Sequence, residues 1–297
     1  MRVSSVWIVL SLIAAVLMAI ASAAGALSGD TYARETVSWA AQGAGQDIVN
    51  VLVAFPLLAF GALYTHLGFA RAHLVWIGAL MYTAYSYVLY AFFVHFGPWF
   101  LVYVAILGLS TYALAGSVAS LEIPKLPAVF TRAGHTRGAA AFLMFVGCTF
   151  AALWLGDIIP AVIAGRTPAS VTASGFAVNP VHVLDLALFL PGTIATSVLL
   201  WKRRPLGLLF AVPFLVFTAL MGLAIVTMTF MMRAHGLPAD LAIVPVIGAL
   251  VLCSVWFAAR LLVDVRDEDL ASAETGASSP SPAHGAGAIP TPSGRFR

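Results

Sequence analysis

Long apolar runs, separated by short polar breaks, dominate the sequence up to about residue 264. A run of about 20 apolar residues can cross the roughly 30 Å hydrocarbon layer of a bilayer as a helix. Such a helix satisfies its own backbone groups where no water is present. The pattern predicts an all-α, polytopic transmembrane helix bundle of eight spans, covering residues 6–27, 48–70, 74–95, 99–121, 139–163, 181–201, 206–232 and 241–263.

The first apolar run has a second interpretation. Arg2, the run behind it and the small residues Ala21, Ser22 and Ala23 also resemble a secretory signal with its cleavage site. Cleavage would leave seven spans and would not change the orientation of those downstream. We expect the first span to be retained, which gives a transmembrane domain over residues 1–264.

The composition agrees with a membrane location. Of the 297 residues, 61% are hydrophobic and 9% are charged, whereas a soluble chain has about 25% charged residues. The net charge of +3 is scattered between apolar runs, which argues against nucleic acid as a partner. Cys148 and Cys253 both lie in apolar runs, so the sequence supports neither a disulfide framework nor a cysteine metal site.

The basic residues predict the orientation of the chain. If the N-terminus is cytoplasmic, Arg34, Arg166 and Arg233 fall outside. The others fall inside, namely Arg2, Arg71, Lys125, Arg132, Arg137, Lys202, Arg203, Arg204, Arg260, Arg266, Arg295 and Arg297. Positive charge is enriched on the cytoplasmic side of membrane proteins. We therefore expect both termini in the cytoplasm.

The end of the chain differs from the rest. From about residue 265 the sequence is rich in Ala, Ser, Pro and Gly and has few large apolar residues. Such a segment cannot bury enough apolar surface to offset the entropy lost on ordering. Residues 265–297 are therefore predicted to form a disordered cytoplasmic tail.

Two of the spans open with the same pattern. DIVNVLVAFP (residues 47–56) and HVLDLALFLP (residues 182–191) each have a polar residue, two apolar residues, a polar residue, five apolar residues and a proline. The stretches are 135 positions apart, and in the eight-span topology both enter the membrane from outside. We interpret them as part of a parallel internal repeat of four plus four spans. Pro56 and Pro191 each remove a backbone hydrogen bond and are expected to kink their helices.

The same two stretches supply candidates for a binding site. Residues three apart lie on one face of a helix, which pairs Asp47 with Asn50 and His182 with Asp185. The topology puts these residues in the outer layer of the membrane, together with Tyr87, Tyr90 and Asp157. The sequence predicts an outward-facing polar cavity lined by Asp47, Asn50, Tyr87, Tyr90, Asp157, His182 and Asp185.

Asp185 is the leading candidate among these residues. An ionised carboxylate in hydrocarbon costs about 3 kcal/mol or more, so it usually faces water or a partner. The neighbouring His182 could accept a proton or sense pH. The alternative is structural, with His182 donating a hydrogen bond to Asp185 inside the bundle. For Tyr87 and Tyr90 the alternative is helix packing and interfacial anchoring.

The sequence has no recognised cofactor motif. It contains no Walker-type phosphate loop, no dinucleotide glycine fingerprint and no HExxH zinc helix. A metal site would need a third ligand beside His182 and Asp185, such as Asp157 or His95. We therefore predict no cofactor and no metal, and favour a function other than catalysis.

Four short stretches resemble a known group of proteins. SYVLY, FLVYV, NPVHVLDL and the basic turn KRRPLG are similar to a family of uncharacterised bacterial multi-pass integral membrane proteins with no assigned activity. The resemblance covers roughly residues 47–232 and carries no catalytic residue over. It implies a location in the bacterial plasma (inner) membrane.

Three functions are compatible with these features. The first is a small-molecule or ion transporter, or a related ligand-binding bundle, with an outward-facing polar cavity. The second is an intramembrane enzyme that uses His182 and Asp185 on a lipid-linked substrate. The third is a non-catalytic membrane sensor or assembly subunit. All three have the lipid bilayer as a partner, and the outer polar layer and the repeat favour the first.

Overall fold

The computed structural model describes residues 3–121 and 133–265. Within these residues, eight helices are long and apolar enough to cross a membrane. The elements are α1 (Ser5–Leu27), η1 (Gly29–Tyr32), α2 (Val37–Val49), η2 (Asn50–Ala54), α3 (Phe55–His66), α4 (Ala70–Phe93), α5 (Phe100–Ala119), α7 (Ala133–Ile163), α8 (Ala169–Ser174), α9 (Pro180–Leu184), η4 (Asp185–Phe189), α10 (Leu190–Trp201), α11 (Pro205–Ala234) and α12 (Ile243–Val263). The predicted all-α bundle of eight spans is confirmed. The predicted tail, apart from residue 265, lies outside the described residues.

The second span is longer than the sequence predicted. It begins with α2 at Val37 rather than at residue 48 and continues through η2 and α3 to His66. The Thr36 hydroxyl caps α2 by accepting a hydrogen bond from the backbone N–H of Trp39 at 3.2 Å. Polar residues such as Gln42 and Gln46 lower the apolar signal in α2, and for that reason the predicted start was wrong.

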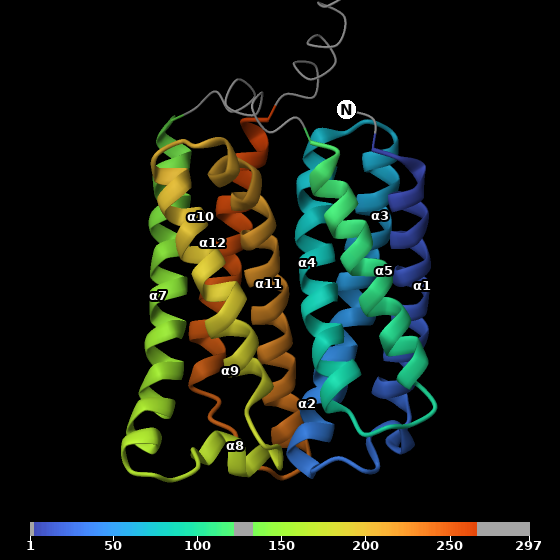
Figure 1. The fold of residues 1–297 in the computed structure, drawn as a ribbon, viewed down its shortest axis with the longest axis vertical. Helices are drawn as coiled ribbons and strands as arrows, with labels where there is room; N and C mark the ends of the chain where they lie inside the picture. The colour runs from blue at the N-terminus through green and yellow to red at the C-terminus, as the bar shows by residue number, and fades with distance from the viewer. Residues whose placement is uncertain (1–2, 122–132, 266–297) are drawn as a thin grey trace, which may run out of the picture.

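The spans form two groups of four that stand side by side (Figure 1). One group contains α1, α2 with α3, α4 and α5, and the other contains α7, α9 with α10, α11 and α12. The groups, here called the first and second units, meet where α4 and α2 pack against α11. A Cβ atom on Gly78 of α4 would lie 2.6 Å from Cβ of Val216 in α11. Glycine at this crossing therefore lets the two helices approach closely.

The boundaries of the elements follow the spacing found in the sequence. Pairs of equivalent positions, each 135 residues apart, are the starts of η2 and η4 (Asn50 and Asp185), the starts of α3 and α10 (Phe55 and Leu190), their ends (His66 and Trp201) and the starts of α4 and α11 (Ala70 and Pro205). The turns between these helices each contain a residue with positive φ, Gly68 at 94° and Arg203 at 52°, at the same spacing. The agreement over several independent boundaries supports the repeat of four plus four spans.

The elements η2 and η4 are π-helical segments that precede the two repeat prolines. The N–H of Phe55 donates to the carbonyl of Asn50, and the N–H of Leu190 donates to that of Asp185, five residues earlier in each case. Pro56 and Pro191 follow directly and have no N–H to continue the ladder. The expected distortion at each proline therefore takes the form of a π turn, a feature often found at functional sites.

The start of α1 and the end of α12 lie at the same end of the bundle (Figure 1). At this end, the Nε of Arg71 donates to the carbonyl oxygen of Val265 at 2.9 Å. His135 at the start of α7 is hydrogen-bonded to Asp264 through Nδ1 and Oδ2, 2.8 Å apart. These contacts connect both units to the end of α12. The short helix α8 lies at the opposite end (Figure 1).

Candidate functional site

A cavity of about 360 Å³ lies between the two units. Its walls come from α2 and α4 of the first unit and from α7, η4, α10, α11 and α12 of the second. Its polar lining residues are Gln42, Gln46, Asn179, Asp185, Thr193, Thr218 and Thr229, and its aromatic ones are Tyr32, Trp39, Tyr85, Tyr90, Phe150, Trp154, Phe189 and Phe217. A concave, mainly apolar cavity with a few convergent polar groups is typical of small-molecule sites.

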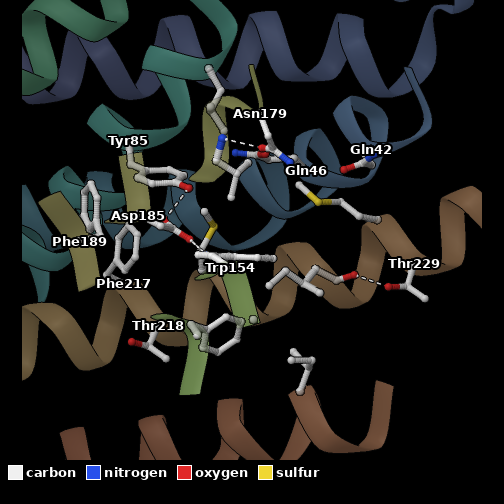
Figure 2. A pocket seen from close by; sticks show the side chains of 18 of the residues that line it. Gln42, Gln46, Tyr85, Trp154, Asn179, Asp185, Phe189, Phe217, Thr218 and Thr229 are labelled. Atoms are coloured by element: carbon white, nitrogen blue, oxygen red, sulfur yellow. Dashed lines mark hydrogen bonds between the residues drawn. The ribbon is translucent and has the colours of Figure 1, made fainter. Parts of the chain in front are cut away.

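Asp185 lies on the cavity wall between two donors from different units (Figure 2). The Tyr85 hydroxyl of α4 donates to its Oδ1 at 2.9 Å. The indole Nε1 of Trp154, in α7, donates to its Oδ2 at 2.8 Å. Asp185 is the first residue of the π segment η4. The π turn and the two donors thus hold one carboxylate where the two units meet.

Three aromatic rings cluster beside this carboxylate. Phe189 stacks on Phe217, with ring centroids 4.3 Å apart. Tyr85 meets both rings edge-on, at centroid distances of 4.7 Å from Phe189 and 5.4 Å from Phe217. Figure 2 shows Asp185 among the rings of Tyr85, Phe217 and Trp154. The packing restricts the movement of the rings and gives the carboxylate an aromatic surround.

The end of the cavity near α8 is more polar and has its own aromatic cover. Trp39 of α2 lines the cavity and packs edge-on against Phe176, in the turn after α8, at a centroid distance of 5.0 Å. Gln42 and Gln46 line the cavity on the same helix. Among the described residues, the Nε2 of Gln46 is a buried donor with no hydrogen-bond partner. A buried donor without an acceptor is costly, so a bound molecule with an acceptor atom would stabilise this side chain.

A second polar cluster lies buried within the first unit. Asp47 accepts hydrogen bonds from the hydroxyls of Tyr32 and Tyr90, the latter at 2.9 Å. Asn50 accepts from the Tyr82 hydroxyl at 3.0 Å and donates to Ser22 of α1 at 3.1 Å. These side chains form a network inside the unit, because Asp47 is only 1% exposed and Asn50 is fully buried.

Tyr32 lies outside the membrane-spanning helices, in η1. Burial raises the pKa of its hydroxyl well above the ordinary value, and the charge of Asp47 raises it further. The hydroxyl therefore stays protonated at neutral pH and is able to donate to Asp47.

The seven residues predicted to line one cavity are distributed over several environments. Asp185 and Tyr90 line the cavity between the units. Asp47 and Asn50 belong to the buried network, as does Tyr87, whose hydroxyl lies 3.4 Å from the Ser22 hydroxyl. Asp157 accepts a hydrogen bond from the Ser170 hydroxyl near α8.

His182 is buried, but it is not the partner of Asp185. Its ring packs on Trp154, with centroids 4.6 Å apart, whereas the described donors to Asp185 are Tyr85 and Trp154. The structural alternative, a hydrogen bond from His182 to Asp185, is not the arrangement found, because Trp154 packs against His182 and donates to Asp185. In the part of the chain that the structure describes, no group of three His, Cys, Asp or Glu side chains is placed to hold a metal ion.

The sequence did not single out Tyr85, Trp154, Gln46, Phe189 or Phe217. Tyr85 belongs to the tyrosine-rich run of the third span, where it is three residues from Tyr82. Tyr82 bonds Asn50 in the first unit, whereas Tyr85 bonds Asp185 in the second. The tyrosines of α4 thus form hydrogen bonds to residues of both units. Which tyrosine faces which unit depends on the rotation of α4, and residue spacing alone does not give that rotation.

Comparisons of the chain with protein-family models, curated proteins and solved structures found no match. The resemblance to a family of bacterial multi-pass membrane proteins therefore stays a prediction.

Proposed function

We propose that this multi-pass membrane protein binds a small molecule in the cavity between its two units and transports it across the membrane. The observation that carries the proposal is Asp185, a carboxylate on the cavity wall that is bonded by Tyr85 of one unit and Trp154 of the other. A change in the packing of the two units would alter the surroundings of this group directly. Ligand binding and unit movement would thereby be coupled.

The internal repeat supports transport in particular. Many secondary transporters consist of repeats, bind substrate at the interface between them and work by rocking one unit against the other. In this chain the cavity lies at such an interface. The π segments η2 and η4 interrupt regular α-helix at equivalent positions, which makes them suitable places for local movement.

We assign both termini to the cytoplasm and the protein to the plasma membrane. Arg71, Arg137 and the run Lys202–Arg204 support this orientation, because they lie at the ends of α3, α4, α7, α10 and α11 that are on the same side as the N-terminus. The end of the cavity near Trp39 would then face outside. The described hydrogen-bond partners of Asp185 are Tyr85 and Trp154 and not His182, which gives no support to an intramembrane enzyme that uses His182 and Asp185 as a pair.

The proposal is testable by a thermal-stability screen of small molecules on the full-length protein in detergent, with wild type beside Thr218→Trp. Thr218 lines the cavity, so a tryptophan there would take up part of its volume and obstruct a bound molecule. At about a hundredfold excess over its Kd, a ligand should raise the Tm of the wild type by about 5 °C or more. The Tm of Thr218→Trp should stay unchanged.

Uptake of the identified compound into proteoliposomes is the second part of this test. We expect Asp185→Asn and Thr218→Trp each to reduce uptake at equal protein content. Compounds that stabilise both proteins equally, or uptake that is unchanged in both variants, would contradict the proposal.

A further inference from the structure

The charge of the cavity is unbalanced. The structure describes all the residues that line the cavity. Asp185 is the only Asp or Glu among them, and they include no Lys, Arg or His. Its described hydrogen-bond donors, Tyr85 and Trp154, are both neutral. A carboxylate inside the membrane without a cationic partner is costly, and such groups usually mark a pathway or a ligand.

Asp185 also has room for another partner. A carboxylate can accept about four hydrogen bonds, two at each oxygen. Tyr85 occupies one position on Oδ1, and Trp154 occupies one on Oδ2. Each oxygen therefore keeps a free acceptor position, and the side chain is only partly buried on the cavity wall. A positive centre in the cavity could approach Asp185 without displacing either donor.

The walls around this carboxylate do not suit a small inorganic cation. Such ions need several oxygen ligands in a close shell. Here the neighbours of Asp185 are rings, with Tyr85 and Phe217 on one side and Trp154 on the other. An organic cation needs no such shell, because its apolar body can pack against aromatic side chains while its charge pairs with the carboxylate. The methionines Met221 and Met228 further along the wall can adapt to an apolar body.

We infer that the cavity takes an organic cation with an apolar body, whose positive centre pairs with Asp185 and whose body packs against the aromatic side chains of the cavity wall. The inference rests on the proposed function, because it names the chemical class of the ligand for the same cavity. The inference is more specific than the proposed function, because a transporter could also have a cavity that binds neutral or anionic molecules.

Two ions of the same shape and opposite charge provide the test. Tetraphenylphosphonium and tetraphenylborate differ at the central atom and in sign, so their comparison separates charge from apolar contact. Binding of radiolabelled tetraphenylphosphonium to the purified full-length protein is measured by equilibrium dialysis in detergent, with empty detergent micelles as the blank. Binding of radiolabelled tetraphenylborate is measured in a separate dialysis, because the two ions form an insoluble salt when they are mixed.

We expect the wild type to bind tetraphenylphosphonium saturably and Asp185→Asn to bind it at least about tenfold more weakly. The matched control is Asp157→Asn, which removes the same charge from the same unit at a residue that does not line the cavity. Its affinity should equal that of the wild type. Thr218→Trp should lose binding, and unchanged elution in size exclusion would show that each variant is folded.

The possible results separate this inference from the proposed function. Equal binding by Asp185→Asn would overturn the cation class, as would tetraphenylborate binding that is equally tight and is lost in Thr218→Trp. Either result would leave the cavity as a binding site. Absence of saturable binding to the wild type would also overturn the inference. Binding that is unchanged in Thr218→Trp would show that the cation binds elsewhere, which contradicts the inference and does not support the proposed function.

Discussion

Asn50 and Asp185 occupy equivalent positions in the two units, but their partners come from different places. Asn50 is bonded by Tyr82, from α4 of its own unit. The position equivalent to Tyr82 in the second unit is Phe217, which has no hydroxyl. Asp185 instead receives one hydrogen bond from Tyr85, across the boundary between the units, and one from Trp154 of its own unit. The second unit thus lacks the hydroxyl that bonds Asn50 in the first, and its carboxylate at the equivalent position is bonded by both units. The described partners of Asn50 all belong to the first unit.

The network around Asp47 leads to a prediction about Tyr32. We expect Tyr32→Phe to lower the free energy of unfolding by about 1–2 kcal/mol at neutral pH, because Asp47 loses a buried donor. The measurement is thermal melting in detergent. The control is Tyr112→Phe, at a residue of α5 that is 68% exposed and should be nearly neutral. Equal effects of the two substitutions would contradict the predicted role of Tyr32.

The pH dependence of this difference has a defined sign. Burial raises the pKa of Tyr32 in the folded protein, so its contribution to stability is fully present below the unfolded pKa of about 10 and is lost as the pH rises further. We expect the difference in stability between wild type and Tyr32→Phe to shrink as the pH rises above about 10. A difference that grew at high pH would contradict the shift.

The sequence predicted the helix on which each polar residue lies, but not the residues that it contacts. Asp185 and Tyr90 reach the cavity, and an apolar run with an isolated carboxylate was a sufficient signal for Asp185. Trp154 and Phe217 could not be found in this way, because an aromatic residue in a span usually packs or anchors. Which face of each helix points inward depends on contacts between helices, and a single sequence does not contain them.

At the level of whole elements, the apolar runs and the repeat pattern predicted most of the architecture. The length of an apolar run is set by the thickness of the bilayer, so all eight spans were predicted from it. The repeat was visible from the matching polar residues and prolines, but the π segments were not. The π turn in η4 depends on how Pro191 interrupts the backbone hydrogen bonds of the helix and on the hydrogen bond from Tyr85 to Asp185. Both depend on tertiary structure, which the sequence pattern does not show.

The contact between α2 and α11 leads to a prediction at the scale of elements. A Cβ atom on Gly45 would lie 2.7 Å from both Cα and N of Met228. Backbone atoms inside a helix cannot move aside, so we expect Gly45→Val to lower the free energy of unfolding by about 1–3 kcal/mol. Thermal melting in detergent measures the effect.

The matched control for this prediction is Gly108→Val in α5, where a Cβ atom would meet nothing within 4 Å. Both variants place a β-branched residue in a transmembrane helix, so their difference reports on the contact between the units. A drop in Tm of the same size in both would mean that close approach of α2 and α11 does not depend on Gly45.

At the scale of the whole molecule, the orientation decides which side the cavity serves. Leu67, in the turn after α3, lies at the end of the bundle that carries the N-terminus, and Thr167, before α8, lies at the other. We expect a membrane-impermeant maleimide added to intact cells to label Thr167→Cys and not Leu67→Cys, in a background with Cys148 and Cys253 replaced by alanine. Inverted membrane vesicles should give the opposite pattern.

The labelling result bears directly on the route of a ligand. Trp39 lines the cavity and packs on Phe176, which follows α8, so this end of the cavity shares its side with Thr167. Labelling of Thr167→Cys from outside would mean that the end of the cavity near Trp39 faces outside, so that the proposed ligand would reach Asp185 from that side. Labelling of Leu67→Cys instead would place the same end of the cavity on the cytoplasmic side.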